Sequence, residues 1–192
     1  MECVNVVERK GRQMAQTTVE GVEGVQGLVG RHLGHSDWVE ITQEQVNRFA
    51  EATGDHQWIH VDPERAERES PFGGPIAHGY LTLSLVPALL PQIIEMTGFR
   101  MGVNYGTEKV RFPSPVPVGS RVRAGATLES ATPFDGGIAM NLGVTMEVEG
   151  GSKPAMVVCT PPAISSTAVI SAPPRTRLPT GTGLGKRTLP VP

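Results

Sequence analysis

Residues 78 to 96 constrain the fold most, because a helix over this range carries apolar side chains on nearly every side. A helix that is apolar all round has to be buried on all sides. Nineteen helical residues span roughly 28 Å, which is long enough to cross a small sheet from edge to edge. Pro87 and Pro91 each remove a helical N–H donor, so we expect them to kink or split this helix.

The chain that follows this helix alternates with a period of two, which is typical of β-strands. We expect strands at residues 104 to 112, 118 to 130, 137 to 148 and about 154 to 160, preceded by a first strand at residues 36 to 41. Short turns rich in Pro or Gly separate the later strands, so neighbouring strands should pair antiparallel. One buried helix against one antiparallel sheet is an α+β layer architecture.

The length of 192 residues predicts one domain with tails. Residues 1 to 35 are rich in Gly and lack a sustained period, so we expect a loosely ordered, flexible leader with a short helix near residues 24 to 33. The domain should occupy residues 36 to 160. Residues 161 to 192 have the Pro-, Thr- and Gly-rich composition of a flexible, disordered tail.

The composition excludes several classes of partner. A formal net charge of −2 gives no basic surplus, which argues against nucleic acid as the main partner. Cys3 and Cys159 make no metal-binding spacing, and a reduced, cytoplasmic protein is the simplest interpretation. We expect no membrane span, because no apolar run reaches transmembrane length, and no secretory signal at residues 1 to 13.

A second informative stretch lies between two helices with strong capping signals. Residues 42 to 45 form a capping box, and Gly54 stands where the helix that they start should end. Asp62 and Pro63 fit the N-cap and the first position of the next helix. The connection at residues 55 to 60 mixes Trp and Ile with Asp, Gln and two His. Neither a plain solvent loop nor a core strand has that mixture.

The landmarks of this region are, in order, Phe49, Thr53-Gly54-Asp55, Ile59-His60 and Ala66. In this order they resemble the signature of the MaoC-like, R-specific enoyl-CoA hydratases. Residues 75 to 80 resemble the second landmark of that family, and residues 111 to 113 with 117 to 119 resemble its third. The resemblance covers residues 36 to 158.

The resemblance implies the hot-dog fold, a single domain in which a curved antiparallel sheet wraps a long central helix. Hot-dog proteins pair their sheets edge to edge, and an exposed sheet edge would otherwise be a liability, so we expect a homodimer. The sequence departs from the family pattern at two places. Gln57 and Trp58 stand where the family usually has Asn-Pro, and Pro87 stands where some members carry Ser near the active site.

Adding water to an enoyl thioester needs a base that activates water, an acid that protonates the α-carbon and a donor that holds the enolate oxygen. Asp55 and His60 offer the first two, although the sequence leaves open which of them takes the proton. By resemblance, the pair holds one water and delivers it to one face, giving the (3R)-hydroxyacyl product. The backbone N–H of Gly79 is the candidate oxyanion donor, because this residue opens the central helix.

Other polar residues of the region have weaker assignments. We place Gln57 and His78 beside the substrate, where Gln57 could orient the water or the thioester and His78 could support the site. His56 and Asp62 could join the catalytic pair as metal ligands. However, Asp62 is already explained as an N-cap, so we expect no metal. No bound cofactor is expected, because the substrate enters with its coenzyme.

The sequence therefore predicts a hydro-lyase that acts on acyl-CoA thioesters in fatty acid metabolism, with Asp55 and His60 as the catalytic pair. Two alternatives stay open. A hot-dog acyl-CoA thioesterase would use a similar pocket but hydrolyse the thioester. The second alternative is a non-catalytic subunit that binds acyl-CoA or a partner, since Gln57, Trp58 and Pro87 could have closed the tunnel for the acyl chain.

Overall fold

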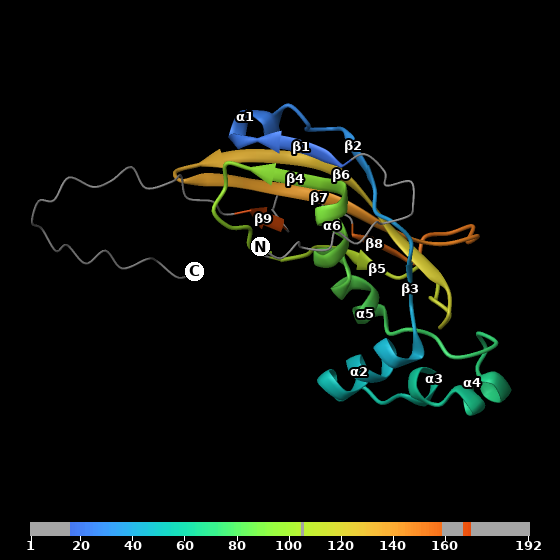
Figure 1. Ribbon diagram of the computed structural model, residues 1–192. Coiled ribbons are helices and arrows are strands. Elements are labelled where there is room, and N and C mark those ends of the chain that lie inside the picture. The colour runs from blue at the N-terminus through green and yellow to red at the C-terminus, as the bar shows by residue number, and fades with distance from the viewer. Residues whose placement is uncertain (1–15, 105, 159–166, 170–192) are drawn as a thin grey trace, which may run out of the picture.

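A computed structural model describes residues 16–104, 106–158 and 167–169, and its main element is a seven-stranded sheet (Figure 1). Every strand pair in this sheet is antiparallel. Five strands follow the order β2 (His32–His35), β6 (Arg121–Phe134), β7 (Gly137–Val148), β8 (Met156–Val158) and β5 (Val110–Arg111). Two short strands join the long hairpin, with β3 (Val39–Glu40) beside β6 and β9 (Thr167–Val169) beside β7.

The β6–β7 hairpin forms the centre of the sheet. Its tight turn contains Gly136 at φ 90°, a conformation that Gly adopts without steric cost. Alternate residues of both strands are buried, and they supply much of the core on the face toward the central helix. These core residues are Val122, Ala124, Ala126, Leu128, Ile138, Met140, Leu142, Val144 and Met146. The predicted period of two is therefore confirmed for this hairpin.

The predicted central helix exists, but it is divided and shorter than expected. It consists of α5 (Gly79–Ser84) and α6 (Val86–Ile93), joined by Leu85 in the right-handed helical region. The expected split is confirmed at Pro87, which lies in the first turn of α6, but Pro91 lies inside α6 and does not split it. The expected end at residue 96 is wrong, because β4 (Ile94–Thr97) pairs in parallel with β1 (Thr17–Glu20).

The expectation that this helix is buried on all sides is also wrong for the single chain. Leu81, Leu89 and Ile93 face the core, whereas Tyr80 is 71% exposed and Pro87 is exposed as well. The helix therefore packs one face against the sheet and leaves an apolar face uncovered. An apolar sequence pattern does not show which of its side chains are buried within a single chain and which stay exposed.

The segment expected to be a loose leader forms regular structure from residue 17 onward. Besides β1, it contains α1 (Gly21–Gln26), whose Val25 is fully buried, and β2, which pairs with β6. The expected short helix thus lies a few residues earlier than predicted. These elements depend on distant pairing partners, which local sequence patterns do not show. The remaining part of the predicted leader, residues 1 to 15, lies outside the described residues.

Strand boundaries differ from the expectations at several places. Only Val110–Arg111 of the predicted strand 104 to 112 pairs, and the expected first strand at residues 36 to 41 is reduced to β3. The strand predicted at residues 137 to 148 is confirmed. Of the predicted tail at residues 161 to 192, only β9 is described. In the described part of the chain, no helix is long and apolar enough to cross a bilayer.

Three further helices lie together at the end of the molecule beyond β3 (Figure 1). They are α2 (Gln43–Thr53), α3 (Trp58–Val61) and α4 (Pro63–Glu69). The capping box at residues 42 to 45 is confirmed, and Asp62 caps α4 by accepting a bond from the Arg65 N–H at 3.0 Å. Gly54 ends α2 in the left-handed region at φ 77°. This residue directs the chain into the connection that begins with Asp55.

Gly54→Ala tests how much this turn depends on glycine. An added Cβ would meet no atom within 4 Å, so the cost is conformational, and we expect a loss of roughly 1–2 kcal/mol in the free energy of unfolding. Gly74→Ala is the matched control, because Gly74 also has open space around it and no left-handed φ. Its effect should stay within about 0.5 kcal/mol. Equal losses in urea denaturation of the two variants would contradict this account.

Candidate active site

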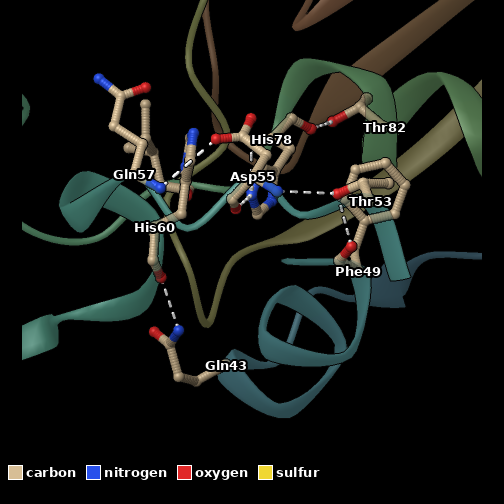
Figure 2. A network of polar contacts seen from close by, with 9 residues as sticks. Gln43, Phe49, Thr53, Asp55, Gln57, His60, His78 and Thr82 are labelled. Atoms are coloured by element: carbon tan, nitrogen blue, oxygen red, sulfur yellow. Dashed lines mark hydrogen bonds and ion pairs between the residues drawn. The ribbon is translucent and has the colours of Figure 1, made fainter. Parts of the chain in front are cut away.

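Two buried histidines, His60 and His78, belong to a polar cluster that lies where three helices meet (Figure 2). Asp55 follows the end of α2, His60 lies on α3, and His78 is the residue directly before α5. One carboxylate oxygen and one ring nitrogen from each histidine all lie within 4.8 Å of one another. The structure therefore brings together Asp55, His60 and His78, which the sequence places in one region.

His60 is held by its Nδ1 atom, which lies 2.6 Å from the carbonyl oxygen of Ile76. A carbonyl oxygen can only accept, so the Nδ1 atom carries the proton, and Nε2 of the neutral ring keeps its lone pair. The ring is only 7% exposed. Burial lowers the pKa of His60 below its usual value, and the opposing effects of the Ile76 bond and the Asp55 charge do not overcome it.

His78 is 2% exposed, and its Nε2 atom lies 3.0 Å from the backbone oxygen of Asp55. The same nitrogen is 4.0 Å from the Oδ2 atom of that residue. The His78 ring contacts the His60 ring, with 3.9 Å between centroids and 30° between planes, and it contacts the Phe49 ring at 5.1 Å. These contacts join His78 to both Asp55 and His60.

Asp55 is the solvent-facing member of the cluster, with 55% of its side chain exposed. Its Oδ1 atom accepts a bond of 3.4 Å from the backbone N–H of Gln57. Gln57 thus contributes a backbone donor to the site. A divalent cation could reach the Asp55 carboxylate and His60 Nε2. The two imidazole planes are tilted by 30°, and one nitrogen of each ring is already bound to a backbone oxygen, so each histidine has one nitrogen left that could bind a metal.

A pocket of about 390 Å³ opens beside His60. Gly79 lines it as the first residue of α5, together with Thr82 of the same helix. Its wall also includes Phe72, Ile76, Phe112 and Val116. A Cβ on Gly79 would lie 3.1 to 3.2 Å from the Phe112 ring, so a larger residue would crowd this wall. The expected oxyanion donor and His60 therefore face the same cavity.

A larger pocket of about 550 Å³ lies along the central helix. It is mostly apolar, and its lining comes from α5, α6, the strands β7 and β8, and the segment before β5. The apolar lining consists mainly of Leu83, Val86, Pro87, Leu90, Leu142, Val144 and Val158. Such a cavity suits a hydrocarbon chain.

Sequence reasoning missed two parts of the site. The backbone oxygen of Ile76 fixes the His60 ring, and nothing in the sequence marks a backbone acceptor. Phe72 lines the pocket from the turn after α4, where an exposed aromatic residue gave no periodic signal. Phe112 did lie within a landmark of the resemblance, but the sequence did not show that it packs against Gly79.

Comparisons with known proteins identify the family of this chain. The family model "MaoC like domain" matches residues 25–149, and the chain belongs to this family. The chain is 53% identical over 141 residues to 3-hydroxyacyl-thioester dehydratase Z of Mycobacterium tuberculosis, which covers 73% of this chain and 93% of that protein. It is 49% identical over 137 residues to nodulation protein N of Rhizobium meliloti, with 69% and 83% covered.

Solved structures show the same architecture. The (R)-hydratase from A. caviae involved in PHA biosynthesis aligns with a TM-score of 0.55 and 26% identity, over 75% of this chain and 98% of that chain. A monoamine oxidase regulatory protein from Archaeoglobus fulgius aligns with a TM-score of 0.64 at 22% identity, over 84% of this chain and 100% of that chain, which shows the fold alone. The chain is a hot-dog protein of the MaoC-like hydratase and dehydratase family.

The lowered pKa of His60 predicts how the free energy of unfolding depends on pH. Below pH 6.5 the unfolded chain binds a proton at this residue before the native chain does, so the free energy of unfolding should fall as the pH falls. His60→Gln removes this contribution, and its unfolding free energy should depend less on pH between pH 7 and pH 5. Urea denaturation at a series of pH values measures both slopes. Ser84→Ala, an exposed and uncharged change, should keep the wild-type slope, and equal slopes for wild type and His60→Gln would refute the prediction.

Proposed function

We propose that this protein is a hydro-lyase that adds water to trans-2-enoyl-CoA to give (3R)-hydroxyacyl-CoA, or catalyses the reverse dehydration. The convergence of Asp55 and His60 beside a pocket that Gly79 also lines is the observation that carries this proposal. The 53% identity to a 3-hydroxyacyl-thioester dehydratase supports the same chemistry. The proposal needs no cofactor.

In the proposed reaction, Asp55 and His60 hold one water between them. The Nε2 lone pair of His60 accepts a hydrogen bond from this water, since the Nδ1 proton is bound to Ile76. As the water oxygen bonds to C3 of the enoyl group, one of its protons passes to the catalytic pair. The pair returns a proton to C2, which completes the hydration with its atoms balanced. The reverse sequence eliminates water.

Negative charge develops on the thioester oxygen while C2 waits for its proton. Gly79 is the first residue of α5, so its N–H has no acceptor within the helix and can donate to that oxygen. The acyl chain would extend into the apolar pocket along α5 and α6. Pro87 lines that pocket and brings no hydroxyl group to it.

The uncovered apolar surface supports a homodimer as the working form. Tyr80 is 71% exposed and packs edge-on against the half-exposed Phe112 ring, at 6.2 Å between centroids. Both lie near β5, the short strand at one edge of the sheet. A second copy that pairs along this edge would cover both features. We place the enzyme in the cytoplasm, with no nucleic acid as a partner and no membrane span.

Hydration of crotonyl-CoA, followed by loss of the ultraviolet absorbance of the conjugated thioester, tests the proposal. Asp55→Asn and His60→Gln should each lower kcat by about 10²–10⁴-fold, because each removes a positioned acid–base group. Glu51→Gln changes an exposed carboxylate near the end of α2 and should keep full activity. Release of free thiol from crotonyl-CoA would instead indicate a thioesterase. Binding without turnover, unaffected by Asp55→Asn, would indicate a non-catalytic acyl-CoA-binding subunit.

Gly79→Ala tests the oxyanion site. Its Cβ would press on the Phe112 ring and displace the start of α5, and a shift of this kind can lower the rate by about 10²-fold. In the double variant Gly79→Ala/Phe112→Leu, the smaller side chain should relieve the contact and recover part of kcat. Full activity in Gly79→Ala would show that the thioester oxygen does not approach this residue.

A further inference from the structure

We propose that His78 is a positioning residue, which holds Asp55 and His60 in one arrangement without touching the substrate. The inference rests on the proposed function. It concerns a buried group that the hydration steps above do not use. Three contacts of the ring carry it.

The first contact is the hydrogen bond from Nε2 to the backbone oxygen of Asp55 at 3.0 Å. Residues 54 to 57 are all exposed and belong to no helix or strand. Their other described hydrogen bonds reach no further than four residues along the chain. Among the described contacts, the His78 bond is therefore the one that anchors the Asp55 connection to a distant part of the fold.

The second contact is the stacking of the His78 ring on the His60 ring, and the third is the contact with Phe49 on α2. Together they join α2, α3 and the start of α5 through one side chain. The His78 ring covers one side of the His60 ring, and the bond to Ile76 holds the Nδ1 atom of His60. The position of Nε2 of His60 relative to the Asp55 carboxylate is thereby restricted.

The unused nitrogen of His78 supports this role. Because the Asp55 oxygen can only accept, Nε2 carries the proton and Nδ1 keeps its lone pair. Nδ1 is buried and makes no described hydrogen bond. A phenylalanine at this position would avoid a buried acceptor without a partner. The cost of burying Nδ1 without a partner is offset if Nε2 makes a bond that phenylalanine cannot make. The bond from Nε2 to the Asp55 oxygen is such a bond.

A direct contact with the substrate does not fit the geometry. Ala77 and Gly79, on either side of His78, both line the pocket beside His60. The His78 side chain instead turns into the protein, where it is 2% exposed. Figure 2 shows His78 close to both Asp55 and His60. Its influence on the reaction therefore passes through the other two residues.

Two substitutions separate the hydrogen bond from the ring. His78→Gln can place an amide N–H near the position of Nε2, whereas His78→Phe keeps a ring and loses the donor. We expect His78→Phe to lower kcat for crotonyl-CoA hydration by about 10²-fold with KM nearly unchanged, since a small misplacement has an effect of this size. His78→Gln should recover most of kcat. His56→Gln, a change at an exposed histidine of the same connection, should behave as wild type.

A double-substitution cycle tests whether the effect passes through Asp55. In the Asp55→Asn background, His78→Phe should lower kcat much less than it does in the wild type, because the group it positions is already lost. Independent, multiplicative effects would overturn the inference. So would a raised KM with unchanged kcat, which indicates substrate binding, or equal losses in His78→Gln and His78→Phe. Should His78→Phe not fold, His78→Met replaces it as a side chain without a donor.

A readout without substrate keeps this inference separate from the proposed function. The backbone amide NMR signals of Asp55 and Gln57 should stay in place in His78→Gln, and they should shift and broaden in His78→Phe. If the wild type lacks hydratase activity but these signals behave as expected, the proposed function fails and the positioning role stands. Unchanged signals in His78→Phe would overturn the positioning role, whatever the activity.

Discussion

The hydrogen bond between Nδ1 of His60 and the carbonyl oxygen of Ile76 connects the two halves of the site. It joins α3 to the segment that leads into α5. The backbone N–H of Ile76 also donates to the Ile59 oxygen at 3.0 Å, and Ala77 pairs with Val116 next to the sheet. The helix that carries His60 is thus fixed against the segment that leads into α5, the helix that Gly79 opens. Without this backbone junction, His60 and Gly79 would belong to separate elements with no fixed distance between them, whereas the Asp55 connection is held by the bond to His78.

Much of the local structure around the site could be predicted from the sequence, because short-range interactions decide it. The capping box at residues 42 to 45 and the cap at Asp62 depend on side chains within three residues of the groups that they bind. The left-handed turn at Gly54 follows from the absence of a Cβ. The long strands β6 and β7 follow from alternation over more than ten residues each. Asp55 and His60 could be named because this capped region mixes polar and large apolar residues and resembles the family signature, and their catalytic roles stay a prediction.

The parts that could not be predicted depend on distant partners. The helix ends at Ile93 because Ile94–Thr97 pairs with Thr17–Glu20, and neither segment shows its partner in its own sequence. Alternation likewise does not show where the partner strand ends, so only two residues of the expected strand at 104 to 112 pair. The acceptor on Ile76 is a backbone atom, which every residue possesses. His78 could be assigned to the region, but not to the Asp55 oxygen that it binds.

The two catalytic candidates have opposite environments, and this difference suits the proposed reaction. Burial favours the neutral form of His60 and lowers its pKa, so the ring can accept a proton near neutrality. More than half of the Asp55 side chain faces solvent in the single chain, where water competes for its hydrogen bonds. A positioned water reacts well only when bulk solvent is excluded from the site. The thioester substrate would supply part of that cover. A second copy along the uncovered face near Tyr80 would add to it, because Phe112, which Tyr80 contacts, lines the pocket beside His60.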